Sequence, residues 1–215
     1  MGFYTPSQLV QDARRHGVEV RAVDVMHSAV ETTLEDRPGT PAVRLGLHKV
    51  QGLRTASAQR IVAERHKAPF DSAEELARRA RLEQSEMKLL AAGGALASLS
   101  GHRRQQVWDA AALHAPPALL QDAPVDEDFW ELPAAPEGED VLWDYASLGL
   151  TLRSHPMALL RARLHRYKLK TSEELRRTPH GRTVRTAGIV TLRQRPQTAN
   201  GTVFVSLGDG HGSTT

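Results

Sequence analysis

A single glycine, Gly52, separates a short apolar segment from an amphipathic one in the stretch LHKVQGLRTASAQRIVAER, residues 47–65. The apolar residues around it are spaced so that two short helices can pack against each other: Leu47, Val50, Leu53, Ala58, Ile61 and Val62. Glycine adopts the left-handed backbone of a tight hairpin without steric cost. The stretch therefore predicts a helix-hairpin-helix, and an ordinary helical hairpin with Gly52 as its C-cap is the alternative.

A helix-hairpin-helix is suited to binding phosphate. The first N–H groups of its second helix have no partner inside that helix, and they lie at the positive end of the helix dipole. A phosphate oxygen can accept from them, and glycine lets the backbone approach closely. We therefore take Lys49, Gly52, Leu53 and Arg54 as candidate DNA-binding residues, although Arg54 stands where the full motif usually has a second glycine.

The charge of the chain is unevenly distributed. The 215 residues carry 28 Lys and Arg against 25 Asp and Glu, a net charge of +3. Nine of the acids lie in residues 116–145, a strip without Lys or Arg, so the remainder carries 28 bases against 16 acids, or +12. A basic body suits a polyanionic partner such as nucleic acid, and a solubilising surface charge is the alternative.

Composition and motifs exclude several classes of protein. The absence of cysteine excludes a disulfide framework and suits a reducing compartment. No apolar run is long enough to span a bilayer and no signal-peptide pattern is present, so we expect a cytoplasmic protein without a membrane partner. The ten histidines never fall at metal-ligand spacing, and there is no Walker A loop or Gly-x-Ser-x-Gly elbow. The sequence therefore predicts no metal site and no catalytic residue.

The N-terminal segment predicts a capped helix followed by strands. Thr5 and Gln8 form a capping box around Pro6. Alternating residues at 18–22 predict a half-buried strand, a polar loop covers residues 31–41, and AVRLGL is a second strand-like piece.

More helices are predicted after the Gly52 hairpin. PFDSAEELARRA carries a cap at Asp71 or Ser72, and EQSEMKLLAAGGALASL breaks at its paired glycines. GHRRQQVWDAAALHA opens with the basic pair Arg103 and Arg104, which we take as further candidate phosphate contacts in a second, degenerate hairpin unit. A small helical bundle whose arginines merely cover its surface is the alternative.

The acidic strip is predicted to be a linker because PPALLQDAPVDEDFWELPAAPEGED contains five prolines and shows no helical or strand period. Asp126 and Asp128 form an Asp-x-Asp pair of the kind that holds two magnesium ions in polymerases. No predicted strand holds this pair rigidly, so the linker interpretation is favoured.

The C-terminal segment changes to a β pattern. TVRTAGIVTLRQRP and TVFVSL predict two strands, joined by the turn-forming loop QRPQTANG. Two strands with a basic loop resemble the first part of an OB-fold, which binds single strands. We take Arg193 and Arg195 as candidate contacts with single-stranded DNA; a solvated hairpin loop is the alternative. Because two strands cannot close a barrel, we expect their apolar faces to lack partners.

These segments together carry a family resemblance. The resemblance rests on four segments, in this order: GFYTPSQLVQDARRHGVEV, VRLGLHKVQGL, SLGLTLRSHPMALLR and AGIVTLRQRPQTANGTVFVSL. Through them, nearly the whole chain resembles bacterial C-family DNA polymerases. LGLTLRSHP is specific to that family. RQRPQTANGTVFVSL points to its error-prone branch, the damage-tolerant paralogues of the polymerase III alpha subunit.

The resemblance implies a mainly α fold with small β segments, in which a helix-hairpin-helix helical domain is followed by a truncated OB-fold. It divides the chain into five ranges: the end of a fingers-like region at 1–42, the helix-hairpin-helix region at 43–115, the acidic linker at 116–145, a helical connector at 146–178 and an incomplete OB-fold at 183–215.

The resemblance also implies a function, that of the DNA-binding C-terminal portion of an error-prone DNA-directed DNA polymerase, a nucleotidyltransferase in damage-induced mutagenesis and translesion repair synthesis. The family's catalytic palm lies upstream of the matched region. We therefore expect this chain alone to be inactive and to need no cofactor, with magnesium serving the full polymerase. A stand-alone helix-hairpin-helix DNA-binding or repair-scaffold protein without enzymatic activity is the alternative.

Duplex DNA backbone and single-stranded template are the implied partners, with the sliding clamp or other mutagenesis proteins as further candidates. Two details depart from the family pattern. Asn200 stands where the error-prone branch tends to have lysine, and the strip offers only Leu119-Leu120 and Phe129-Trp130 toward a clamp-binding peptide, without a clear match.

Overall fold

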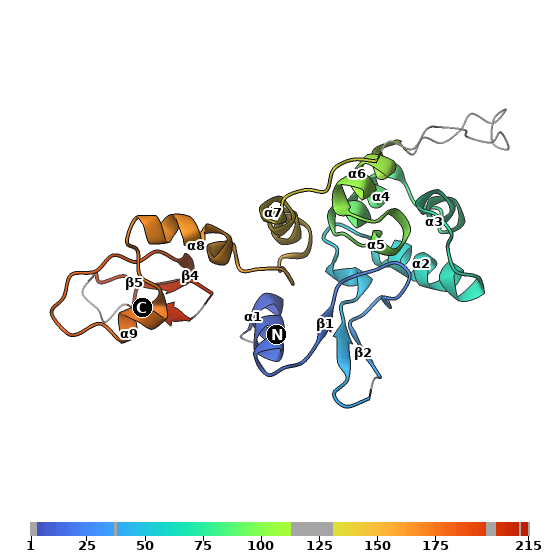
Figure 1. The fold of residues 1–215 in the computed structure, drawn as a ribbon. Helices are drawn as coiled ribbons and strands as arrows, with labels where there is room; N and C mark the ends of the chain where they lie inside the picture. The colour runs from blue at the N-terminus through green and yellow to red at the C-terminus, as the bar shows by residue number, and fades with distance from the viewer. Residues whose placement is uncertain (1–3, 37, 113–130, 197–200, 211, 215) are drawn as a thin grey trace. The chain divides into compact units, whose positions relative to one another are not determined.

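The protein is described from a computed structural model that covers residues 4–36, 38–112, 131–196, 201–210 and 212–214. Its contacts divide the chain into two compact units, Met1–Leu152 and Arg153–Thr215 (Figure 1). The boundary falls inside the predicted connector of residues 146–178, so that its first residues belong to the helical first unit.

The first unit is mainly helical. Its helices are α1 (Pro6–Arg15), the 3-10 helix η1 (Leu47–Lys49), α2 (Thr55–Lys67), α3 (Ala73–Arg79), α4 (Gln84–Ala92), α5 (Ala97–Ser100), α6 (Arg103–Ala112) and α7 (Glu137–Leu148). The predicted capping box of α1 is confirmed, with the Thr5 hydroxyl accepting from Gln8 N and the Gln8 side chain accepting from Thr5 N at 2.8 Å. Ser72 caps α3 as the sequence indicated.

A small sheet precedes the hairpin in the first unit. Its strands are β1 (Val20–Arg21), β2 (Thr33–Glu35) and β3 (Ala42–Arg44), in the order β1-β3-β2. β3 pairs in parallel with β1 and antiparallel with β2, where Leu34 lies opposite Val43. β2 lies in the segment predicted to be a loop. That prediction missed the strand because Leu34 is 69% exposed, so no buried apolar face marks it.

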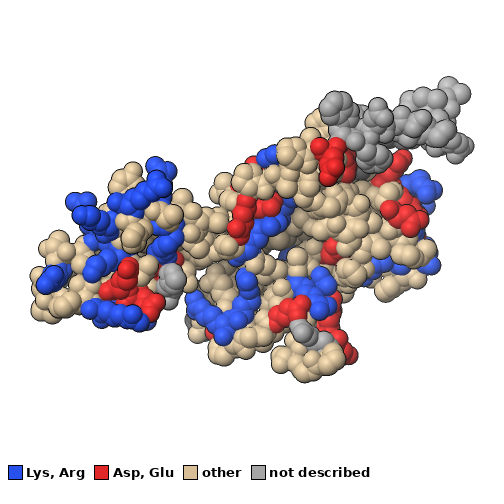
Figure 2. All heavy atoms as spheres, viewed as in Figure 1, with Lys and Arg blue, Asp and Glu red and all other residues tan. Residues whose placement is uncertain are grey.

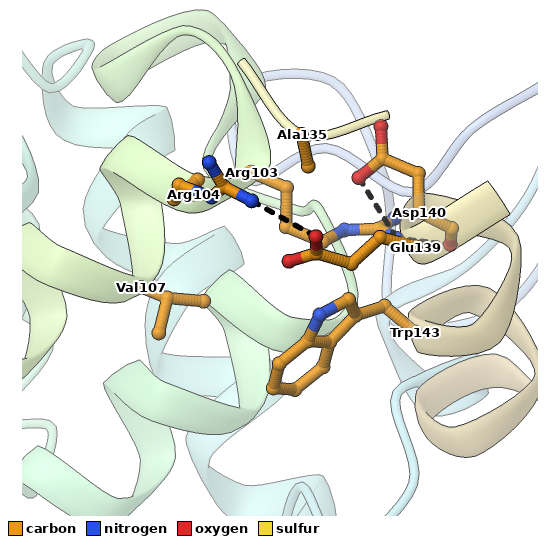
Figure 3. Close-up of a pocket in the computed structure, with 7 residues that line it drawn as sticks. All are labelled: Arg103, Arg104, Val107, Ala135, Glu139, Asp140 and Trp143. Atoms are coloured by element: carbon orange, nitrogen blue, oxygen red, sulfur yellow. Dashed lines mark hydrogen bonds and ion pairs between the residues drawn. The ribbon is translucent and has the colours of Figure 1, made fainter. Parts of the chain in front are cut away.

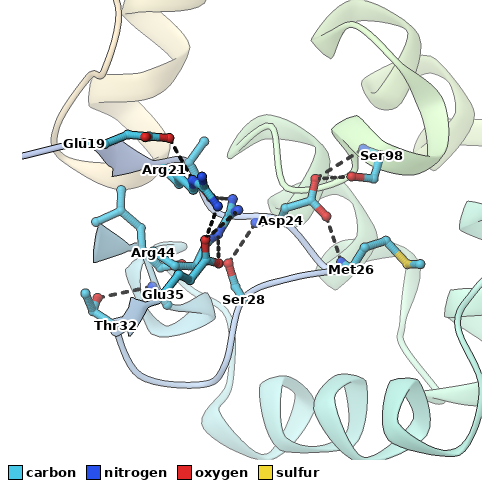
Figure 4. Close-up of polar contacts among 12 residues, drawn as sticks. Glu19, Arg21, Asp24, Met26, Ser28, Thr32, Glu35, Arg44 and Ser98 are labelled. Atoms are coloured by element: carbon cyan, nitrogen blue, oxygen red, sulfur yellow. Dashed lines mark hydrogen bonds and ion pairs between the residues drawn. The ribbon is translucent and has the colours of Figure 1, made fainter. Parts of the chain in front are cut away.

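Polar contacts hold the sheet together instead (Figure 4). The Glu35 carboxylate accepts from Arg44 Nε at 2.7 Å and from Arg21 Nη1 at 2.6 Å, so the two outer strands and the central strand share one ion-pair cluster. The Arg44 hydrogen bond, assisted by Arg21, holds the pKa of Glu35 below its ordinary value despite partial burial.

Asp24 connects the sheet region to the helices. One carboxylate oxygen accepts from Met26 N at 2.7 Å, and the other accepts from the Ser98 hydroxyl at 2.7 Å (Figure 4). The Ser28 hydroxyl donates to Leu45 O at 2.7 Å. These hydrogen bonds satisfy polar groups that are buried under the helices, which makes their burial tolerable.

The apolar core of the first unit is built around α4, whose Met87, Leu90 and Ala91 are fully buried. α4 packs against α6 and α7. Leu47, Ile61 and Leu76 from other helices join the same core cluster. The helix-hairpin-helix region therefore sits on one continuous core, which fixes the position of its turn.

The second unit combines helices with a small antiparallel sheet. It contains α8 (Pro156–Arg166), α9 (Ser172–Arg176), β4 (Ile189–Gln194), β5 (Phe204–Gly208) and β6 (Ser213–Thr214), with the strands in the order β4-β5-β6. Pro156 occupies the first turn of α8, as predicted. β6 adds a short third strand to the two that the sequence indicated.

Apolar side chains of this sheet are exposed on β4 and next to it on the β5 side. Every residue of β4 is exposed, including Ile189 at 41% and Val190 at 55% of their surface, and Val203 and Val205 are more than one third exposed. The strands therefore lack apolar partners within the described residues, as the sequence analysis expected. The described strands form an open sheet and do not by themselves show an OB-fold.

Buried Asp209 joins the helices of the second unit to the end of β5. Its carboxylate accepts from Ser172 N at 2.7 Å, from the Ser172 hydroxyl at 2.9 Å and from Gly212 N at 3.1 Å. Arg161 donates to Asp209 O at 2.7 Å. Among the described residues of both units, no helix is long and apolar enough to cross a membrane.

Candidate nucleic-acid interface

The hairpin predicted around Gly52 is present between η1 and α2, although its first arm is a single 3-10 turn. Leu47, Val50 and Ile61 are at most 1% exposed, so both arms are anchored in the core. Gly52 has a φ of +82°, in the left-handed region that favours glycine, and it is exposed. Leu53, half-buried, closes the turn by donating its backbone N–H to Val50 O at 3.2 Å.

Two neighbouring helices hold this turn in place. A Cβ added to Gly52 would lie 3.3 Å from Cδ1 of Leu89, so α4 packs directly against the turn. On its other side, Gln51 N donates to Ser147 O on α7 at 2.8 Å. The direction in which α2 leaves the turn is therefore set by α4 and α7.

The second arm, α2, begins without a side-chain cap. Arg54 is its N-cap residue, with extended backbone, and its carbonyl accepts from Ser57 N at 3.0 Å and Ala58 N at 3.1 Å. Within the described residues, the N–H groups of Thr55 and Ala56 have no acceptor. These open donors lie at the positive end of the helix dipole, where a phosphate oxygen can accept from them.

The Arg54 side chain contacts carboxylates of the protein itself. It donates to Glu86 Oε1 at 3.0 Å and to Glu83 Oε1 at 2.9 Å. The hydrogen bond that Arg54 donates to Glu86, followed by the one to Glu83, raises the pKa of Arg54 above its ordinary value. Glu86 is only 4% exposed and also accepts from the Ser57 hydroxyl. Arg54 therefore braces the first turn of α2 against α4.

This brace predicts a dependence of stability on pH. Burial raises the pKa of Glu86, but hydrogen bonds from Arg54, Ser57 and Glu83 N outweigh it, and the net pKa is below the ordinary value. A carboxyl group of this kind stabilises the fold above its unfolded-state pKa, about 4.3, and loses that contribution as pH falls through its lower folded pKa.

We expect Glu86→Gln to lower the free energy of unfolding at neutral pH by about 1–2 kcal/mol, because buried donors lose a charged acceptor. The loss should shrink in acid, where the native carboxyl is also protonated. Urea unfolding at several pH values measures both effects. Glu74→Gln, at an exposed position on α3, is the control. Equal losses in the two variants would contradict the assigned role.

Lys49 is the candidate cation next to the turn. It is half-buried at the end of η1, and its ammonium has no ion pair or hydrogen bond with any residue that the structure describes. Its charge is therefore available to a partner, in contrast to the balanced charge of Arg54.

Arg103 does not have the surface role expected from the sequence. Its side chain is 6% exposed and pairs with the Asp144 carboxylate. It also donates to the backbone oxygen of Asp140 at 2.7 Å, the neighbour drawn beside it in Figure 3. It packs so closely on Gly94 that a Cβ there would lie 2.8 Å from Nη2. Two carboxylates from α7 draw this arginine inward, so it joins α6 to α7 and cannot reach a phosphate outside.

Arg104 is also engaged by α7. It donates to Glu139 Oε2 at 2.9 Å and is about one third exposed. Together with Trp143 and Val107 it lines a surface pocket of about 180 Å³ (Figure 3). Arg104 thus keeps partial access to solvent, with its charge offset by a neighbour.

The acidic partners of these arginines come from the predicted linker. α7 begins at Glu137, inside residues 116–145, so the linker prediction is wrong for its last part. Pro136 precedes the helix, and three acids in the first turn complement the helix dipole. Pro136 and these three acids, which had indicated a linker, are thus the start signals of a helix.

The remaining candidates belong to other parts of the chain. Arg193 lies on β4 opposite Val205, and Arg195 follows the strand; both are exposed. Asn200 lies outside the described residues, as do Asp126 and Asp128. Among the described residues, no group of three or more His, Asp or Glu side chains could hold a metal ion.

The positive charge of the chain is concentrated in the second unit, which the charge summed over the whole chain does not reveal. Residues 153–215 contain 12 Lys and Arg against 3 Asp and Glu, or +9, whereas residues 1–152 contain 16 against 22, or −6. Figure 2 shows Lys and Arg spread over the visible face of the second unit. Counting charge separately for each unit, and not for the chain without its acidic strip, would have revealed this surplus.

Comparison with known proteins agrees with the hairpin geometry. A family model described as a helix-hairpin-helix motif matches residues 17–106. Proteins named error-prone DNA polymerase match almost the whole chain. That of Azoarcus sp. (strain BH72) is 52% identical over 219 residues, covering 99% of this chain and 21% of the relative.

The chain is homologous to one segment of the error-prone DNA polymerases. The protein of that name from Ralstonia nicotianae is 50% identical over 99% of this chain and 20% of its own length. The one from Methylococcus capsulatus is 46% identical over 97% of this chain and 22% of its own length. The chain thus spans about a fifth of the error-prone polymerases that it matches, and the resemblance seen in its motifs is confirmed.

Proposed function

We propose that this chain is the DNA-guiding portion of an error-prone DNA-directed DNA polymerase acting in damage-induced mutagenesis and translesion synthesis. The observation that carries this proposal is the open N-terminus of α2 at the Gly52 turn, within the residues that match the helix-hairpin-helix model. In the proposed role the hairpin holds the backbone of duplex DNA.

The binding mode follows from the donors at the turn. The N–H groups of Thr55 and Ala56 donate to phosphate oxygens, and Lys49 adds a positive charge beside them. None of these contacts reads a base edge, so binding is independent of sequence. Arg54 orients the turn through Glu86, and Arg103 is left out of the interface because it is buried.

Nucleotidyl transfer is assigned to residues elsewhere in the whole polymerase. That chemistry needs rigidly held carboxylates around two metal ions, and the described residues offer no such cluster. The magnesium of the polymerase therefore has no fitting site among them. The open β4-β5-β6 sheet, with its exposed apolar side chains, is proposed to be the start of an OB-fold in which Arg193 and Arg195 face single-stranded template.

The test is a titration of the whole chain with duplex DNA. We expect Lys49→Gln to weaken binding at low salt and to reduce the slope of log affinity against log salt by about one unit, because one phosphate contact is lost. Lys67→Gln is the matched control, since it removes the same charge from the far end of α2. Equal effects of the two variants, or affinity that does not respond to salt, would contradict the proposal.

A further inference from the structure

A pocket in the second unit has a different chemistry from the hairpin. It has a volume of about 290 Å³. It is lined by Tyr167, Lys168, Lys170, Thr183, Val184 and Arg185. Its two walls, residues 167–170 and 183–185, are joined by hydrogen bonds. Lys170 N donates to Arg185 O at 2.8 Å, and the Thr186 hydroxyl donates to Lys170 O at 2.9 Å. The pocket is therefore part of the folded unit and not a gap between loose segments.

The lining is cationic and contains no carboxylate. Three of its six residues are Lys or Arg, within a unit of net charge +9. Lys170 donates to the Thr178 hydroxyl at 3.1 Å, which holds its ammonium in place. Glu174 is the acid that interacts with Lys170. Its carboxylate also accepts from Thr171 N at 2.7 Å in the capping box of α9. Glu174 thus partly balances Lys170, whereas Lys168 and Arg185 have no carboxylate partner among the described residues, so their charges are left to an anion from outside.

The pocket also presents an aromatic ring to solvent. Tyr167 is 62% exposed, and Val184 beside it is 37% exposed. An exposed aromatic ring next to cations is the arrangement with which proteins bind single-stranded nucleic acid, because a base stacks on the ring while the cations contact the phosphates.

Lys168 has a backbone that its residue type disfavours. Its φ is +57°, at the end of α8, where Lys168 N donates to His165 O at 2.9 Å and Leu169 N donates to Leu164 O at 3.2 Å. Glycine usually occupies this position of a helix C-terminus. Lysine in this conformation costs stability compared with glycine, and backbone strain of this kind is often found where a side chain serves function.

We propose that this pocket binds one nucleotide of single-stranded DNA, with the base stacked on Tyr167 and the adjoining phosphates held by Lys168, Lys170 and Arg185. The pocket has a volume of about 290 Å³ and lies beside the exposed Tyr167 ring, on which an unstacked base can stack whereas a base inside a duplex cannot. This site is distinct from the Gly52 hairpin and from Arg193 and Arg195, and it does not depend on the function proposed for the hairpin.

Fluorescence anisotropy of a short labelled oligo(dT), titrated with the whole chain, tests the site. Lys168→Gly should weaken binding about tenfold while raising the thermal unfolding midpoint of the second unit, because glycine relieves the left-handed strain. Tyr167→Ala should weaken binding about tenfold and Tyr167→Phe should preserve it, since stacking needs the ring and not the hydroxyl. A purely structural role cannot produce higher stability together with weaker binding.

The controls separate this site from general charge and from the hairpin. Arg163→Gln removes one charge from an exposed position of α8 outside the pocket and should change oligo(dT) affinity much less than Lys168→Gly does. Duplex affinity should respond to Lys49→Gln and not to Lys168→Gly. Equal losses in Arg163→Gln and Lys168→Gly, unchanged binding in Tyr167→Ala, or equally effective competition by polyglutamate would each overturn the proposal.

Discussion

Replacing Asp144 with alanine is expected to lower the free energy of unfolding of the first unit by about 3–5 kcal/mol, the usual loss when one partner of a buried ion pair is removed. Arg103 and Asp144 are 6% and 7% exposed, and Asp144 also accepts from the Thr151 hydroxyl at 2.6 Å. The variant leaves the Arg103 charge buried beside α7 without its main partner. Urea unfolding followed by tryptophan fluorescence measures the loss, since Trp108 and Trp143 lie on the two joined helices.

The same two helices supply a matched control. Arg104 and Glu139 also join α6 to α7, but they are 36% and 43% exposed, so Glu139→Ala should cost less than about 1 kcal/mol. A double variant, Arg103→Met with Asp144→Leu, should recover part of the stability lost in Asp144→Ala, because the Arg103 charge is no longer buried without its main partner, although Asp140 loses its pairing with Arg103. Similar losses in Asp144→Ala and Glu139→Ala would show that burial does not strengthen this pair.

The pair also links the acidic strip to the Gly52 hairpin. Asp144 fixes α7 against α6, and α7 in turn accepts the Gln51 N–H of the hairpin through Ser147 O at 2.8 Å. A segment predicted to be a linker thus supports the Gly52 turn. We infer that loosening α7 weakens duplex binding even though no residue of α7 belongs to the proposed interface.

Local patterns predicted the hairpin well because its signals are short-range. The spacing of Leu47, Val50 and Ile61 around Gly52 placed the turn correctly, since these core residues all lie in one short segment of the chain. The partners of the charged residues could not be predicted in this way. Arg54 pairs with Glu86 and Arg103 with Asp144, at separations of 32 and 41 residues, and a single sequence gives no signal for such contacts.

The same reasoning explains why β2 was missed and why the strands β4 and β5, although correctly predicted, leave their fold family open. β2 is held in the sheet by the ion pairs of Glu35 with Arg21 and Arg44, so a search for alternating apolar residues misses this strand. β4 and β5 were predicted from their β-branched residues, but their apolar side chains are exposed, so the pattern does not show what covers them. Whether they belong to an OB-fold stays a prediction.

Gly52→Val is expected to weaken duplex binding by about tenfold to a hundredfold, because hydrogen bonds to a charged phosphate contribute about 1.5–3 kcal/mol each. The new side chain requires the left-handed φ of +82° and a Cβ 3.3 Å from Leu89, so the turn must shift. That shift carries the Thr55 and Ala56 N–H groups away from the phosphate. The fold itself should lose about 1–3 kcal/mol from the backbone strain.

Gly17→Val separates the loss of stability from the loss of binding. Gly17 has a similar φ of +78°, with nothing within 4 Å of an added Cβ, and it lies at the end of α1 away from the hairpin. Because both variants place a branched residue in left-handed backbone, their stabilities should fall by similar amounts, whereas only Gly52→Val should lose duplex affinity and part of its salt dependence. Equal affinities of the two variants, measured where both remain folded, would remove the Gly52 turn from the DNA interface.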